Sequence, residues 1–173
     1  MDCKDLILDG LGRVDEHMRE YLLGLTAEQL VYRPHADANW IGWLAWHLTR
    51  VEDDHISDLA GVPELWLQDG WHARFDRPAT DDTGFGHTSE DVAHIRPSSV
   101  QLLLDYFGAV HTRSVEYVRG VTCGDLDREL DEPWDPPVTV GVRLISVLDD
   151  CMQHAGQMAY IRGLIEARRW LPY

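Results

Sequence analysis

The stretch from residue 147 to residue 165, VLDDCMQHAGQMAYIRGLI, is a helical pattern with polar residues in its apolar row. At about 100° of rotation per residue, the side chains within roughly 40° of His154 form one helix face. That face contains Val147, Asp150, Met158, Ile161 and Ile165. Because burying an unpartnered carboxylate is costly, Asp150 requires an arginine, a hydrogen-bonded histidine or a metal cation beside it.

The stretch from residue 39 to residue 59, NWIGWLAWHLTRVEDDHISDL, shows the same anomaly in a second helix. The face centred on His47 contains Trp40, Trp43, Leu44, Val51 and Asp54. Apolar faces oppose one another in a helical bundle, so we expect His47, Asp150 and His154 to meet at one cation. Two imidazoles and one carboxylate suit Zn²⁺, Ni²⁺ or Fe²⁺, and three protein ligands leave positions open for water or substrate.

Each half of this pattern also has a simpler interpretation. A lone histidine in a core row is more often hydrogen-bonded than a metal ligand, and Asp150 with His154 can form an ordinary pair within one helix. The occurrence of both features on two helices favours the metal site.

The remaining sequence predicts an all-α protein, because it contains four long helical patterns and no convincing strand. We expect one four-helix bundle domain over residues 1–173. Residues 61–97 form an irregular connection between the second and third helices, which is typical of a functional loop and permits a crossover. The helices are expected at about residues 5–24, from Asp37 or Asn39 to 60, 100–120 after a cap at Ser98, and 139–168.

Five further residues have expected roles. Trp66 and Trp71 lie in the long connection and can line a pocket over the site. Gly156 is expected at a close helix contact, and Gln157 is expected to hydrogen-bond near the site. Cys151 is turned about 100° from Asp150 on the helix and is expected to be a buried structural thiol.

Composition excludes several classes of partner. The 173 residues include 15 Lys and Arg and 30 Asp and Glu, which gives a net charge of 15 − 30 = −15. Such a chain repels nucleic acid and anionic membranes. No apolar run is long enough to span a bilayer, and the first residues do not have the pattern of a signal peptide. The three cysteines suggest neither a disulfide framework nor a zinc site, so a reducing cytoplasm is expected.

The two histidine-bearing stretches resemble the DinB-like superfamily. The motifs are N-W-x-x-x-x-x-W-H-L at residues 39–48 and D-x-x-x-H-A-G-Q-x-x-Y-x-R-G-L at residues 150–164. The resemblance is closest to the actinobacterial branch near the metal-binding domain of mycothiol-dependent maleylpyruvate isomerase. It implies a four-helix bundle with a zinc or nickel site. Many members have His-x-x-x-His on the last helix, whereas Asp150 stands here at the first position, where the isomerase branch has a carboxylate.

The resemblance also implies a metal-dependent thiol S-transferase. A low-molecular-weight thiol such as mycothiol would bind the metal as a thiolate and attack an electrophilic small molecule. Two alternatives remain: a hydrolase with metal-activated water, and a non-catalytic, metal-stabilised binding or stress-response module. The sequence assigns no catalytic residue beyond the three candidate ligands. The tryptophan-rich helix faces make a homodimer a reasonable expectation.

Overall fold

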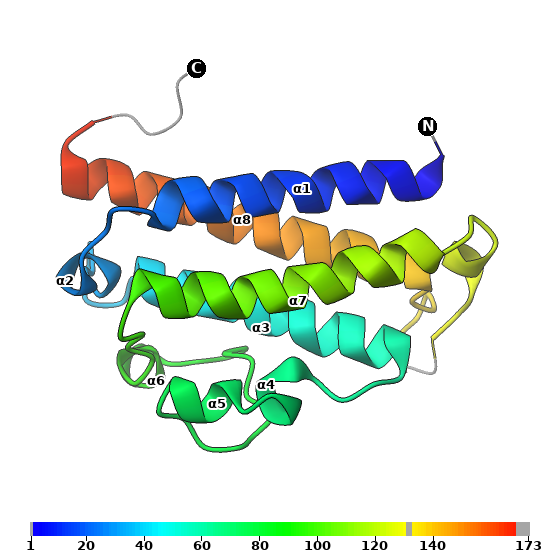
Figure 1. The fold of residues 1–173 in the computed structure, drawn as a ribbon, viewed down its shortest axis with the longest axis horizontal. Helices are drawn as coiled ribbons and strands as arrows, with labels where there is room; N and C mark the ends of the chain where they lie inside the picture. The colour runs from blue at the N-terminus through cyan, green and yellow to red at the C-terminus, as the bar shows by residue number, and fades with distance from the viewer. Residues whose placement is uncertain (1, 131–132, 169–173) are drawn as a thin grey trace.

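The computed structural model describes residues 2–130 and 133–168, and four long helices dominate it (Figure 1). The expected all-α four-helix bundle is confirmed. An isolated antiparallel bridge between Glu129 and Thr139 is the one β contact within these two described ranges. The four long helices are α1 (Cys3–Leu22), α3 (Ile41–Ala60), α7 (Val100–Gly120) and α8 (Val140–Glu166).

The long helices form a bundle in which α1 and α3 each pack against both α7 and α8. In Figure 1, α1 and α8 run in one direction, and α3 and α7 run in the opposite direction. Since α3 and α7 are parallel neighbours, the chain must return along the bundle between them. This crossover explains the long connection that the sequence predicts.

Short helical turns interrupt the connections. Capping boxes at Thr26 with Gln29 and at Thr88 with Asp91 begin two of them, because each hydroxyl accepts a backbone N–H that the helix leaves unpaired. The short elements are α2 (Ala27–Leu30), α4 (Leu65–Gln68), α5 (Trp71–Arg74), α6 (Ser89–Ala93) and the 3-10 turn η1 (Asp125–Asp127).

Two expected helix caps are wrong. The N-cap of α3 is Trp40, which makes no capping hydrogen bond through its side chain, and not Asp37 or Asn39. The indole of Trp40 instead donates to the carbonyl of Ile95 at 3.1 Å, so tertiary packing fixes where α3 begins. The cap of α7 is Ser99 and not the preceding serine.

Trp66 and Trp71 do not line a pocket over the candidate site, contrary to expectation. Both side chains are buried, and their rings lie 5.5 and 5.3 Å from the ring of Tyr106 on α7. They join the long connection to the core, because burying large aromatic rings contributes strongly to packing.

The cysteines also differ from the expectation. Cys3 at the start of α1 forms a disulfide with Cys123, just beyond the end of α7. The sequence suggested no disulfide framework, and this bond corrects that expectation. Cys151 is a free and fully buried thiol, as predicted, and burial raises its pKa well above the ordinary value. No helix in the described part of the chain is long and apolar enough to cross a membrane.

Glu52 of α3 is a buried acid in the bundle interior. Its side chain is fully buried, and neither carboxylate oxygen has a hydrogen-bond partner among the described residues. The pKa of Glu52 is raised to about 7, mainly by burial; the neighbouring Ser114 acts to lower it, and the carboxylates of Asp53 and Asp15 add to the rise. The charged form of Glu52 therefore destabilises the fold.

We expect Glu52→Gln to make the free energy of unfolding less dependent on pH. The carboxyl has its ordinary pKa of 4.5 in the unfolded chain and a pKa of about 7 in the folded chain. Wild-type stability is therefore lost as pH rises through this window, by about 3 kcal/mol in total. In urea unfolding at several pH values across this range, the free energy of unfolding should fall less steeply with pH in Glu52→Gln than in the wild type. The exposed Glu116→Gln is the control, and equal pH slopes in the two variants would contradict the raised pKa.

Candidate metal centre

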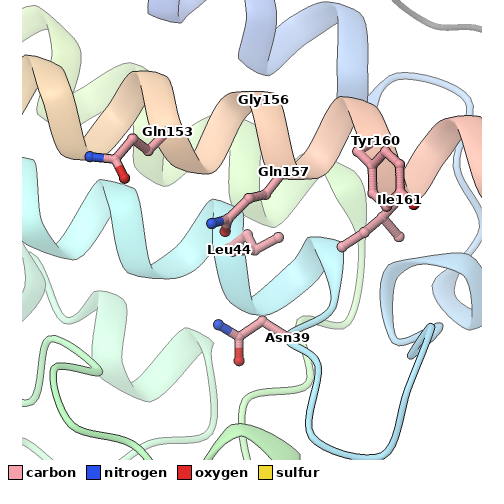
Figure 2. Close-up of a pocket in the computed structure, with 7 residues that line it drawn as sticks. All are labelled: Asn39, Leu44, Gln153, Gly156, Gln157, Tyr160 and Ile161. Carbon is pink, nitrogen blue, oxygen red and sulfur yellow. The ribbon is translucent and has the colours of Figure 1, made fainter.

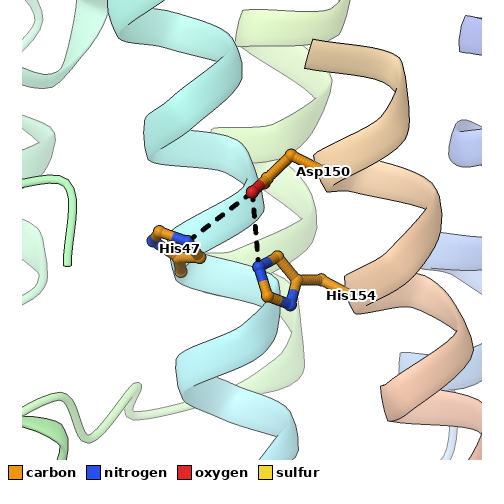
Figure 3. A group of neighbouring side chains, drawn as sticks. All are labelled: His47, Asp150 and His154. Atoms are coloured by element: carbon orange, nitrogen blue, oxygen red, sulfur yellow. Dashed lines mark ion pairs between the residues drawn. The ribbon is translucent and has the colours of Figure 1, made fainter. Parts of the chain in front are cut away.

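His47, Asp150 and His154 lie together between α3 and α8 (Figure 3). Asp150 Oδ1 lies 4.0 Å from His47 Nε2 and 3.4 Å from His154 Nε2. One ligand atom from each residue lies within 4.8 Å of the others. We call these three residues the triad. The expected meeting of the two polar anomalies is therefore present in the fold.

Hydrogen bonds on the far side of each imidazole set its orientation. His47 Nδ1 lies 2.5 Å from the carbonyl oxygen of Thr83, and His154 Nδ1 lies 2.9 Å from Gln157 Oε1. Both oxygens are acceptors, so in each neutral imidazole Nδ1 carries the hydrogen and Nε2 has its lone pair on the side of Asp150. The predicted hydrogen bond of Gln157 is thus confirmed.

The triad has the polarity of a cation site. Asp150 Oδ2 is buried without a hydrogen-bond partner among the described residues, while Oδ1 of the same carboxylate lies beside both imidazoles. Within the same residues, Asp150 pairs with the two histidines and with no arginine. A divalent ion with nitrogen and oxygen ligands would satisfy the carboxylate and both lone pairs, so the residues fit such an ion.

The two histidines have opposite pKa shifts. Burial lowers the pKa of His47, and this effect outweighs its hydrogen bond to Thr83. Burial also acts to lower the pKa of His154, but the protonated ring can donate to Asp150 as well as to Gln157, and these interactions outweigh burial and raise the pKa. His47 therefore favours the neutral imidazole that can ligate a metal.

The loop that supplies the Thr83 carbonyl is held by buried side chains. Arg50 of α3, which is 0% exposed, donates from Nε to the carbonyl of Asp82 at 3.0 Å and from NH2 to the carbonyl of Asp81 at 3.4 Å. The indole of Trp66 donates to the carbonyl of Thr80 at 3.0 Å. These bonds fix the backbone just before Thr83, so they also fix the acceptor for His47.

Arg50 is itself held by an acidic and aromatic network. Its guanidinium lies 2.6 Å from Glu64 Oε2, 3.5 Å from Asp53 Oδ2 and 3.3 Å from the hydroxyl of Tyr106. The Tyr106 hydroxyl in turn donates to Asp53 at 2.8 Å. A buried charge needs such partners. Arg50 was not among the functional residues expected from the sequence.

Trp43 and His87 complete the wall around His47. The Trp43 ring stacks on His47 with centroids 4.6 Å apart, and its indole donates to His87 Nδ1 at 3.2 Å. His87 Nε2 then donates to Asp82 Oδ1 at 3.0 Å. Both nitrogens of His87 are engaged, so His87 supports the loop and does not join the triad.

An open cleft lies beside the triad and has a volume of about 460 Å³. We call it the site cleft. Phe85 is 93% exposed on its wall, and two members of the triad also line it. The long connection therefore shapes the cleft, as expected, although through residues other than the two predicted tryptophans. The lining residues are His47, Val51, Asp54, His55, Thr83, Phe85, Ser146 and Asp150.

A second cleft of about 480 Å³ lies between α8 and the start of α3 (Figure 2). We call it the amide cleft because three of its lining residues carry side-chain amides. Gly156 belongs to it, and a Cβ added there would meet no atom within 4 Å. The expected close helix contact at Gly156 is therefore wrong. The lining residues are Asn39, Leu44, Gln153, Gly156, Gln157, Tyr160 and Ile161.

We expect Gly84→Ala to disturb the loop more than Gly86→Ala. Both glycines have a positive φ, so both substitutions carry a strain of about 1 kcal/mol. At Gly84 the added Cβ would also lie 2.8 Å from Trp46 and 3.0 Å from His47 Nδ1, whereas at Gly86 it meets nothing within 4 Å. The additional overpacking should cost about 1–3 kcal/mol in urea unfolding. Equal losses of unfolding free energy in the two variants would show that Gly84 is not packed tightly against His47.

The chain is similar to known proteins in both sequence and structure. A crystal structure described as a conserved protein from Enterococcus faecalis is 32% identical to this chain, with a TM-score of 0.90. The match covers 97% of this chain and 99% of the other. No curated protein matches the sequence. The family whose sequence model matches residues 7–167 is described as mycothiol S-transferase. The chain therefore belongs to the mycothiol S-transferase family of the DinB-like superfamily.

Proposed function

We propose that this protein is a metal-dependent S-transferase that joins a mycothiol-like thiol to an electrophilic small molecule. The observation that carries the proposal is the convergence of two imidazole lone pairs and a carboxylate at an open cleft. The membership of the chain in the mycothiol S-transferase family supports the choice of a thiol as the nucleophile.

In this proposal His47, Asp150 and His154 hold a divalent ion, with zinc or nickel as the candidates. The hydrogen bonds that the two Nδ1 atoms donate to Thr83 and Gln157 keep both Nε2 atoms directed at this position. The ion would lower the pKa of a coordinated thiol so that the thiolate forms near neutral pH. Three protein ligands would leave coordination positions for a substrate, and two of the three residues line the site cleft, which favours an enzyme over a purely structural metal.

The chain positions the reactants in the site cleft. His47 and Asp150 lie on its wall beside the exposed ring of Phe85, so an apolar electrophile can lie against the ring next to the triad. The thiol sulfur forms a bond to the electrophilic carbon, and the leaving group departs with its electron pair. The thiol proton passes to solvent through the open mouth of the cleft.

We expect His47→Ala and His154→Ala each to lose most of the bound metal, because each removes one of three ligands. Elemental analysis of protein purified without added metal provides the measurement. His94→Ala is the control, since this histidine is exposed at the end of α6 and lies outside the triad. Unchanged metal content in both triad variants would reject the site.

We expect Phe85→Ala to raise the KM for an apolar electrophile such as 1-chloro-2,4-dinitrobenzene by about fivefold, because it removes apolar contact area. The KM for mycothiol and the metal content should not change. Trp134→Ala is the control, because it removes another exposed aromatic ring that does not line the site cleft.

The hydrolase alternative has its own test. If wild-type protein loaded with metal consumes no thiol but hydrolyses esters, the hydrolase alternative replaces the transferase.

A further inference from the structure

The two clefts lie one after the other along the pair of helices α3 and α8. Along α3, Leu44 lines the amide cleft, His47 belongs to the triad and Asp54 lines the site cleft. Along α8, which runs in the opposite direction, Gln157 lines the amide cleft and Ser146 lines the site cleft. The triad therefore lies between two recesses, which is an arrangement suited to two substrates.

Among the residues that the structure describes, the lining of the amide cleft has no charged side chain, although 45 of the 173 residues of the chain are acidic or basic (15 + 30). Its polar groups are the amides of Asn39, Gln153 and Gln157 and the phenol of Tyr160 (Figure 2). Amides and phenols both donate and accept hydrogen bonds, so they match hydroxyl and amide groups on a ligand. They provide no cation to pair with a carboxylate, and a net charge of −15 disfavours anions further.

Gln157 connects the amide cleft to the triad. Its Oε1 accepts the Nδ1 hydrogen of His154, so its NH2 group remains to contact a ligand in the cleft. A molecule bound there is separated from the metal ligand His154 by one side chain. A thiol-bearing arm of such a molecule would extend past Gln157 toward His154 and the triad.

We propose that the amide cleft binds the uncharged, hydroxyl-bearing body of the thiol substrate and selects it against thiols that carry carboxylates. The electrophile then occupies the site cleft. This inference rests on the proposed S-transferase function and adds where the thiol binds and which chemical class of thiol is accepted.

The test introduces a cation into the amide cleft by Gln153→Lys. The metal-loaded protein is assayed with 1-chloro-2,4-dinitrobenzene, and kcat/KM for mycothiol is compared with kcat/KM for glutathione, which carries two carboxylates. A lysine in the cleft can pair with a carboxylate, so the ratio should shift toward glutathione by about tenfold.

The chain offers a matched control in Gln101→Lys on α7. Gln101 donates to Asp105 at 2.7 Å, four residues away, just as Gln153 donates to Asp149 at 2.7 Å. Both glutamines are exposed on long helices, but Gln101 lines neither cleft. An equal shift in the two variants would come from overall charge alone and would overturn the proposal.

A binding measurement separates this inference from the proposed function. S-methyl mycothiol has no free thiol, so its affinity, measured by calorimetry, does not depend on turnover. Asn39→Ala and Tyr160→Phe should each weaken it by about fivefold, because each removes hydrogen-bonding capacity. If wild-type protein conjugates no thiol, the S-transferase function fails while this measurement still decides the location. Unchanged affinity in both variants would overturn the assignment of the cleft.

Discussion

The buried guanidinium of Arg50 is the interaction on which the candidate site depends most. It is fully enclosed, so its charge must be satisfied inside the protein, and Glu64 and Asp53 provide the negative partners. Its remaining donors hold the backbone carbonyls of Asp81 and Asp82. The next residue, Thr83, supplies the oxygen that orients His47. An ion pair away from the triad therefore determines which nitrogen of His47 faces Asp150.

Helix rotation explains why the triad could be predicted from sequence. Residues on a helix have a fixed angular relation, so a polar group in an apolar row is visible without coordinates. The same test places Arg50 about 60° from His47, on the side that is buried, so a signal for it was present. The roles of Thr83 and Gly84 had no such signal. A loop has no repeating geometry, and a backbone carbonyl can belong to any residue type.

The fold was predictable where local patterns decide it and not where distant contacts do. Four apolar periodicities depend on neighbouring residues, and the four long helices appear as expected. The start of α3 depends on the contact between Trp40 and Ile95, 55 residues away. The disulfide joins Cys3 to Cys123 across 120 residues because α1 packs beside α7. Such contacts follow from the completed packing and cannot be obtained from spacing alone.

The long connection buries a side of α3 that would otherwise face water, and this burial links the fold to the site. In a plain four-helix bundle one face of every helix meets water. Here every residue from 41 to 50 is buried, because the connection covers the outer side of α3. Asp53 binds this cover directly by accepting the backbone N–H groups of Leu65 and Trp66 at 3.0 and 2.8 Å. Burial on both sides lets α3 hold His47 toward α8 while it anchors the loop behind it. The crossover is therefore a structural requirement of the triad.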